Sequence, residues 1–379
     1  MADPRTLESA IKALATDPEL LARFRADPAT VGTEVGLDAE WAGVVAAGDR
    51  DRLRSAGVGD GVTILVSRWF ADDLGDSSST GRLHVEHTEL PDPDVPADLV
   101  FAGGCSHVPD LLARPEIDPA DGVARLSTAY ARLASDLAAA APDVLLVTAD
   151  CHFQTFRTAA TVVGTGATHT GSMAFFKRPD LDLTLTGDPE LARTIIDAVR
   201  AEGMEVEEAG TVELDHGLIV PLRQLLPRPD LPVVPIITQP ARGFSPFGSR
   251  AWGEVLRTVV ESSGRRVAML ATGGLSHWLD PGRFGAVDEE FDAYLLEMLE
   301  AGKGTELGNL EPLALLGHGQ YEFANWLIML GLVGPGVRGE VYAYEPMQAS
   351  GGGWTVVHMP LPPDSAARQA GRERVAADG

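Results

Sequence analysis

Short apolar runs alternate with longer amphipathic stretches from Asp98 to about Pro360. The short runs are rich in Val, Ile and Leu, and several are apolar at every position, as in strands that are covered on both faces. Strands that alternate with helices in this way predict a sheet with a helix layer on each side. We therefore expect an α/β fold here, a central sheet with helices on both faces.

The predicted elements follow from apolar periodicity and from glycine and proline punctuation. Strands are expected at 99–102, 144–148, 160–164, 233–238, 267–272, 341–344 and 355–358. Helices are expected at 123–141, 189–202, 248–262, 287–301 and 320–330.

The residues before this region predict a separate, small all-helical domain over 1–75. Asp17-Pro18 and Asp27-Pro28 place a capping residue and a proline where helices begin. Residues 76–97, with Ser77 to Thr80 and several prolines, have no apolar period and predict a linker. The α/β domain is then expected over 98–361, and residues 362–379 as a disordered tail with little to bury.

The composition limits the classes of partner that this protein can bind. The formal net charge of −25 over 379 residues opposes binding to nucleic acid or to an anionic membrane. No apolar run approaches the roughly 18 residues that a membrane-spanning helix needs. The N-terminus lacks the apolar core of a signal peptide, and two cysteines make no disulfide framework. We therefore expect a cytoplasmic protein.

Histidines gather where the predicted strands end. His107 and His152 follow two strands almost directly, and His277 follows a third. His216 lies in a Leu-Asp-His-Gly turn, and carboxylates gather at 288–292, where a helix is expected to begin. Open α/β sheets bind their ligands beyond the carboxyl ends of the strands. The pattern therefore predicts one site that these segments share.

Imidazoles and carboxylates of this kind suit a metal ion. Two neutral histidines and one carboxylate on one face of a metal leave other positions open, the arrangement typical of non-haem Fe(II) enzymes. A further histidine that is not a ligand can move protons. The residues alone do not name the metal, and histidines in loops also serve as structural hydrogen-bonding groups.

At this point the sequence resembles the class III extradiol ring-cleavage dioxygenases, the family of protocatechuate 4,5-dioxygenase and gallate dioxygenase. The resemblance rests on ordered segments, and it covers nearly all of 98–361. The matching segments are Gly103-Gly-Cys-Ser-His-Val-Pro109, Asp150-Cys-His-Phe-Gln-Thr-Phe156, Leu214-Asp-His-Gly-Leu-Ile-Val-Pro-Leu222, Gly273-Gly-Leu-Ser-His277, Asp288-Glu-Glu-Phe-Asp292 and the stretch from Gly319 to Met329. Residues 1–75 resemble the small α subunit of the two-subunit members, here fused in front of the catalytic part.

The resemblance implies a function and a set of site residues. His107, His152 and Glu290 would bind Fe(II), and His216 would be the acid/base catalyst. His277 would lie near the site as a supporting or substrate contact. The expected reaction is extradiol opening of a catecholic or aminophenol-type ring with O2. The helical part would cover the site within one chain or across a homodimer.

Two further residues are expected near the substrate. His169 lies in the glycine-rich stretch 164–171, which lacks the lysine of a phosphate-binding loop. Arg283 lies between the Gly-Gly-Leu-Ser-His segment and Glu290, where it could hold an acidic substrate.

The two cysteines keep a second metal open. Cys151 stands where the family has Asp directly before the second histidine, and Cys105 lies two residues before His107. On an extended backbone, residues two apart face the same side, and thiolates beside histidines suit Zn(II). The alternatives are therefore a Zn(II)-dependent hydrolase-like enzyme on the same scaffold and a non-catalytic binding protein. If buried, both cysteines would act as small apolar residues.

Overall fold

The protein is described from a computed structural model. It describes residues 6, 7, 10, 11, 13, 14, 18–47, 52, 53, 56, 85, 90–152, 161–239, 245–278 and 283–363. The chain divides into two compact units, 1–82 with 241–243 and 83–240 with 244–379. The predicted linker falls mostly outside the described residues, as does the predicted tail beyond residue 363.

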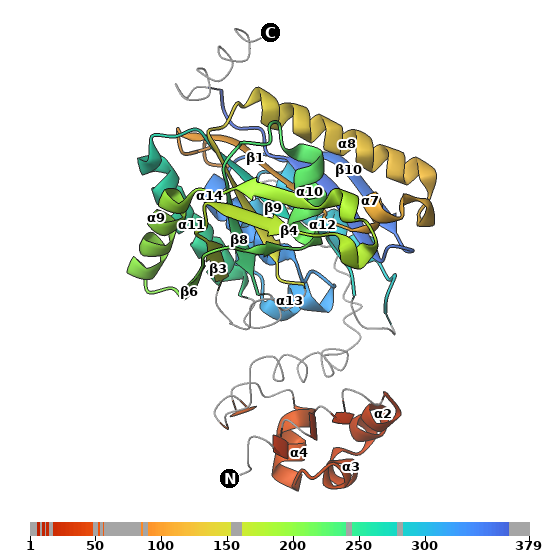
Figure 1. The fold of residues 1–379 in the computed structure, drawn as a ribbon. Helices are drawn as coiled ribbons and strands as arrows, with labels where there is room; N and C mark the ends of the chain where they lie inside the picture. Colours follow the sequence, from red (N-terminus) through yellow and green to blue (C-terminus); the bar gives the residue numbers. More distant parts are fainter. Residues whose placement is uncertain are drawn as a thin grey trace. The chain divides into compact units, whose positions relative to one another are not determined.

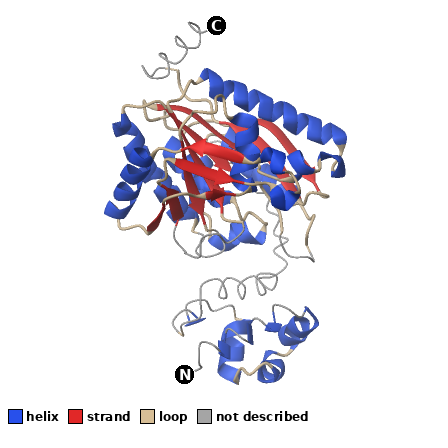
Figure 2. Ribbon diagram, in the orientation of Figure 1, coloured by secondary structure: helices blue, strands red, loops and turns tan. Residues whose placement is uncertain are grey.

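The described part of the first unit is helical, as the sequence predicted (Figure 2). Its helices are α2 (Pro18–Ala26), α3 (Pro28–Glu34) and α4 (Ala39–Ala46). Asp27 and Asp38 cap α3 and α4, each accepting a hydrogen bond from a backbone N–H in the first turn. Phe24, Val31 and Val45 are among the buried residues of a separate apolar core. This unit therefore has a core of its own.

The second unit is built on an eight-stranded sheet, which confirms the predicted α/β class (Figure 1). Its strands, in spatial order, are β10 (Glu340–Met347), β11 (Gly352–His358), β1 (Leu99–Cys105), β9 (Val267–Thr272), β2 (Val144–Asp150), β8 (Val233–Thr238), β3 (Thr161–Gly164) and β6 (Val206–Ala209). The four central strands β1, β9, β2 and β8 are parallel, and every residue in them is buried.

A second, three-stranded sheet was missed by the sequence prediction. It consists of β5 (Leu183–Thr186), β4 (Thr168–Gly171) and β7 (Glu213–Leu214). These strands have four residues or fewer and are rich in threonine, so they offer no apolar run. They form because Leu185 and Leu214 cover the main core while the threonines of β4 face outward.

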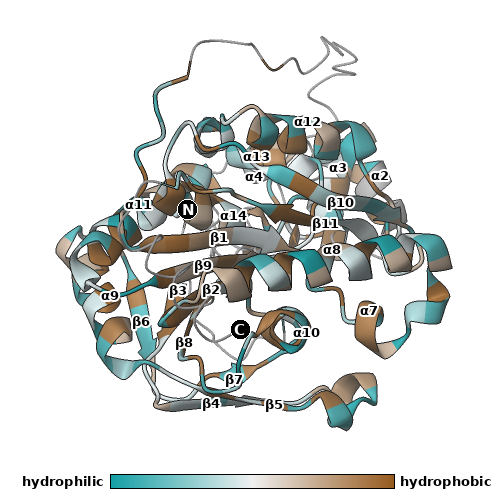
Figure 3. Ribbon diagram, turned by 90° about the horizontal axis from the view of Figure 1, so that it is seen from above, coloured by the Kyte–Doolittle hydropathy of each residue, from teal (hydrophilic) through white to brown (hydrophobic). Residues whose placement is uncertain are grey.

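Helices cover both faces of the main sheet (Figure 3). On one face, α8 packs against α10 and against β1 and β11, whereas α14 packs on the other face against α11, β9 and β1. The helices of this unit are α7 (Asp110–Ala113), α8 (Ala120–Ala139), α9 (Pro189–Ala201), α10 (His216–Leu225), α11 (Pro246–Ser263), α12 (Glu289–Glu300), α13 (Pro312–Gly317) and α14 (Phe323–Val333). Among the described helices, none has the length and apolarity needed to cross a bilayer.

Two features of this fold create the site. The carboxyl ends of the parallel strands β1, β9 and β2 lie side by side because β9 pairs with both of the others. Helix α14 also packs tightly on β1, because a Cβ atom at Gly104 would lie 2.4 Å from the Trp326 ring. Glycine at position 104 therefore lets the start of α14 approach the strand ends.

Candidate metal centre

His107 follows β1 and is held by the end of β9. Its Nδ1 lies 3.0 Å from Thr272 Oγ1, and that hydroxyl itself donates to the Gly217 carbonyl at 2.9 Å. The hydroxyl proton is thus already used, so the hydroxyl accepts from His107 Nδ1–H. Fixing the proton on Nδ1 leaves a lone pair on Nε2.

His152 follows β2 and is held by Asp215. Both its backbone N–H, at 3.1 Å, and its Nδ1, at 3.2 Å, lie within hydrogen-bonding distance of Asp215 Oδ2. Burial opposes ionisation of Asp215, but the hydrogen bond to His152 outweighs it and lowers the pKa of Asp215 to about 2. An ionised carboxylate only accepts hydrogen bonds, so the neutral form of His152 carries its proton on Nδ1 and its lone pair on Nε2.

Glu322 completes the cluster from the start of α14. Its Oε1 lies 3.1 Å from His107 Nε2 and 3.5 Å from His152 Nε2, and the two Nε2 atoms are 3.1 Å apart. Its other oxygen accepts a hydrogen bond from the Gly274 backbone at 2.5 Å. Two imidazole lone pairs and a carboxylate oxygen therefore converge on one buried point.

The electrostatics of this point favour a cation. Burial would raise the pKa of Glu322, but His107 and His277 hold it well below its ordinary value, so the carboxylate is an anion. Burial would lower the pKa of His152, but Asp215 and Glu322 outweigh it and raise that pKa well above its ordinary value. Without a metal, the His152 ring therefore takes up a second proton at Nε2, and a bound metal ion would replace that proton. Three acceptors that face one another and draw in positive charge fit a divalent metal ion, and two histidines with one carboxylate fit iron.

Two further histidines border the cluster. The His216 ring lies 4.0 Å from the His152 ring and 5.7 Å from the His107 ring, measured between centroids. Burial, with the neighbouring charge of His152, holds the pKa of His216 well below its ordinary value. His277 approaches from the carboxylate side, with Nε2 3.3 Å from Glu322 Oε1. Neither residue depends on the other for its place, because His216 opens α10 and His277 follows β9.

The predicted third ligand, Glu290, is not part of this cluster. It is exposed in the first turn of α12, whereas Glu322 is 5% exposed and faces both histidines. The correction has a physical cause. All residues of α14 are buried, so a carboxylate at its start must find buried partners. The apolar run that follows Glu322 in the sequence was the signal that could have identified it.

The other two predicted substrate contacts, His169 and Arg283, are held by residues outside this cluster. His169 is fully buried, and its Nδ1 accepts a hydrogen bond from the Val212 backbone at 3.1 Å. It is therefore the buried residue of strand β4 in the small sheet. Arg283 is exposed, and its guanidinium carbon lies 4.2 Å from the centroid of the Trp278 ring, the residue next to His277.

Neither cysteine joins the candidate ligands among the described residues. Cys105 is fully buried in the main core, and burial raises the pKa of its thiol to about 12. Cys151 packs against the same core. Cys105 lies at the last position of β1, so the alternation along the strand does not extend to His107. The expectation of thiolate ligands therefore finds no support at Cys105.

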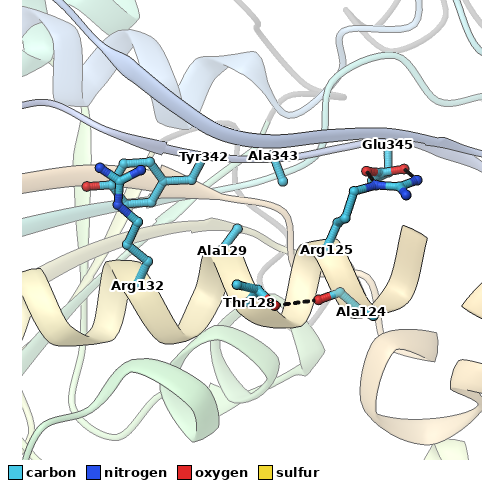
Figure 4. A pocket seen from close by; sticks show the side chains of 8 residues that line it. All are labelled: Ala124, Arg125, Thr128, Ala129, Arg132, Tyr342, Ala343 and Glu345. Carbon is cyan, nitrogen blue, oxygen red and sulfur yellow. Dashed lines mark hydrogen bonds and ion pairs between the residues drawn. The ribbon is translucent and has the colours of Figure 1, made fainter. Parts of the chain in front are cut away.

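A surface pocket of about 400 Å³ lies between α8 and β10 (Figure 4). Its walls are charged but internally paired. Arg125 makes a two-point contact with Glu345, and Arg132 stacks on Tyr342 with its guanidinium carbon 3.7 Å from the ring centroid. The pocket contains no residue of the cluster.

Known proteins match this chain over the same region. A family model described as the catalytic LigB subunit of aromatic ring-opening dioxygenase matches residues 102–356. The chain belongs to this family. The predicted resemblance to class III extradiol dioxygenases is thereby confirmed, and both β1 and α14 lie within or overlap the matched region.

Individual relatives are distant. Gallate dioxygenase of Pseudomonas putida is 30% identical over 167 residues, 42% of this chain and 49% of that protein. A 2,3-dihydroxyphenylpropionate/2,3-dihydroxicinnamic acid 1,2-dioxygenase of Azotobacter vinelandii is 32% identical over 176 residues, 42% of this chain and 52% of that protein. The chain thus spans about half the length of these two relatives.

A longer match and a solved structure extend the comparison. A 2,3-dihydroxyphenylpropionate/2,3-dihydroxicinnamic acid 1,2-dioxygenase 1 of Pseudomonas putida is 27% identical over 290 residues, 61% of this chain and 90% of that protein. The crystal structure of an uncharacterized protein from Escherichia coli K12 has a TM-score of 0.48 and 15% identity, and covers 69% of this chain and 100% of that one.

Proposed function

We propose that this protein is an Fe(II)-dependent extradiol dioxygenase that opens the ring of a catecholic or aminophenol-type compound with O2. The observation that carries the proposal is the convergence of two imidazole Nε2 atoms and one carboxylate oxygen within 3.1–3.5 Å. Membership of a family described as aromatic ring-opening dioxygenases supports the reaction type. The relatives named above act, by their names, on hydroxylated aromatic compounds.

His107, His152 and Glu322 would hold the metal. Ferrous iron supplies the Lewis acidity and the one-electron chemistry that let a catechol react with dioxygen. The chain supplies the rigid frame. Thr272 and Asp215 fix the tautomers of the two histidines, and the Gly274 N–H fixes the carboxylate, so the three ligand atoms are oriented before the metal binds.

The two histidines beside the cluster, His216 and His277, would carry out proton transfer. His216, held at the start of α10 beside His152, would take a proton from a substrate hydroxyl and return it later in the reaction. His277, 3.3 Å from Glu322, stands close enough to the ligand atoms to share this work. Arg283, stacked on Trp278, is the cation that we propose for a substrate carboxylate.

The test combines metal analysis with oxygen uptake. Protein purified without air should contain about one iron per chain, and at least one member of a panel of catechols, aminophenols and trihydroxybenzoates should consume one O2 per ring opened. Zinc without iron, together with no oxygen uptake, would favour the hydrolase-like alternative. Absence of any bound metal would favour a binding protein.

A further inference from the structure

The acidic segment 288–292 contains a buried carboxylate that is not a ligand of the proposed metal. Asp292 is 0% exposed on α12. A Cβ atom at Gly353 would lie 2.2 Å from Asp292 Oδ2, so the backbone of β11 closes directly over this carboxylate. Burying a carboxylate is costly unless hydrogen bonds compensate it, so its partners should reveal why it is there.

Four donors surround Asp292. The Ser276 backbone N–H lies 2.9 Å from Oδ1, and the Ser276 hydroxyl lies 2.7 Å from Oδ2. Gln320 Nε2 donates to Oδ1 at 2.6 Å, and the Tyr344 hydroxyl donates to Oδ2 at 2.7 Å. Each carboxylate oxygen thus accepts two hydrogen bonds, which fixes the carboxylate in position and orientation.

Three of these four donors come from the two segments that border the metal cluster, and the Tyr344 hydroxyl comes from β10. Ser276 directly precedes His277, and Gln320 lies two residues before Glu322. The segments also meet through the backbone, because the His277 N–H donates to the Gly319 carbonyl at 3.1 Å. One carboxylate therefore ties the loop that carries His277 to the loop that carries Glu322.

We propose that Asp292 is a positioning residue that sets the distance between His277 and Glu322 through Ser276 and Gln320. The proposal rests on the proposed function, in which His277 lies beside the reacting substrate. The acidic segment 288–292 was expected to supply the metal ligand Glu290. The proposal gives this segment a different role, through Asp292. An amide at position 292 could not accept all four hydrogen bonds, because one of its two terminal atoms is a donor.

The test is a double-mutant cycle at constant metal content. Asp292→Asn should lower kcat by roughly ten- to a hundredfold, on the scale of supporting partners, with KM changed by less than about threefold. Ser276→Ala should lower kcat by a smaller factor. The double variant should lose no more than Asp292→Asn alone, because coupled residues are not additive. Glu297→Gln makes the same chemical change on the exposed side of α12 and should leave kcat unchanged.

A second readout does not need turnover. In 15N-histidine NMR spectra of the metal-free protein, the His277 ring signals, identified by their absence in His277→Asn, should shift in Asp292→Asn and Ser276→Ala but not in Glu297→Gln. Tyr344→Phe removes one donor to Asp292 and should give a smaller shift of the His277 signals. This variant replaces Asp292→Asn in the test if Asp292→Asn fails to fold. Unshifted His277 signals, or losses in kcat that multiply in the double variant, would overturn the proposal. If the wild-type protein opened no ring but the signals shifted, the proposed function would fail while the positioning role stood.

Discussion

Helices α12 and α14 both begin with acidic residues, yet their carboxylates do different things. At α12, Asp288 caps the helix by accepting from the Phe291 N–H at 3.1 Å, and Glu290 is exposed. At α14, Glu322 makes no capping bond, and its carboxylate turns to His107 and His152. The difference lies in the packing of the helices. One side of α12 faces solvent, whereas α14 is buried all round. An acidic side chain is therefore structural at the start of one helix and a candidate ligand at the start of the other.

The largest effect should come from removing the two carboxylate charges one at a time. Glu322→Gln removes the anion that faces the two histidines, so we expect metal affinity to fall by more than the roughly 100-fold that loss of a supporting partner causes. Glu290→Gln should keep wild-type iron content and turnover. The measurement is the iron content per chain, determined by plasma emission spectrometry after anaerobic purification. It shows which of the two glutamates is needed to hold iron. Iron loss in Glu290→Gln with retention in Glu322→Gln would reverse the assignment.

The histidines around Glu322 should also separate by role. His107→Ala should lose iron, because it removes a ligand atom. His216→Ala should retain iron but lower kcat by about 100- to 10,000-fold, the usual contribution of a general acid or base. The readouts are iron content and oxygen uptake on the same samples. Equal iron loss in both variants would show that His216 is a ligand too.

The tautomer argument predicts an intermediate effect. Thr272→Val keeps the volume of the side chain but removes the oxygen that accepts from His107 Nδ1. Metal affinity should then fall by about 10- to 100-fold, as measured by competition with a chelator. Thr258→Val is the matched control, since Thr258 lies on α11 and its hydroxyl bonds only within that helix. Unchanged affinity in Thr272→Val would remove Thr272 from the account.

The smallest effect should come from the structural side of the comparison. Asp288→Ala removes the α12 cap and should cost about 1 kcal/mol of unfolding free energy, a decrease in Tm of a few degrees, with iron content unchanged. The hydrogen bond from His318 lowers the pKa of Asp288 below its ordinary value of 3.8. The folded pKa is lowered, so this stabilisation is present above pH 3.8 and is lost as the pH falls through the folded value. The Tm values of the wild-type protein and of Asp288→Ala, measured between pH 3 and pH 7, should therefore converge at the acidic end. A constant difference across that range would contradict the assignment.

The local sequence pattern was enough to predict part of this structure. Strands β8 and β9 have the predicted bounds, because a fully buried strand is apolar at every position. The structure brings His107, His152 and His277 to one place, because parallel strands end at one edge of the sheet. The segments that carried the family resemblance, including the one from Gly319 to Met329, lie within the region that the family model matches.

The remainder depends on tertiary packing. Both Glu290 and Glu322 lie near helix starts. Which of them can be a ligand depends on which helix packs on β1, and α14 does so at Gly104. The periodicity of the local sequence does not contain this information. The three-stranded sheet has no apolar run to announce it, because only alternate residues such as Leu185 and Leu214 are buried. The predicted linker and the α-subunit-like role of residues 1–75 remain predictions.

The most direct test of the central claim is the fate of labelled dioxygen. The iron-loaded protein, given 18O2 and the best substrate from the panel, should yield a ring-opened product that contains both labelled atoms, as mass spectrometry would show. Glu322→Gln should yield none. A product with one labelled atom or none, or equal product from Glu322→Gln, would contradict a ring-opening dioxygenase built on His107, His152 and Glu322.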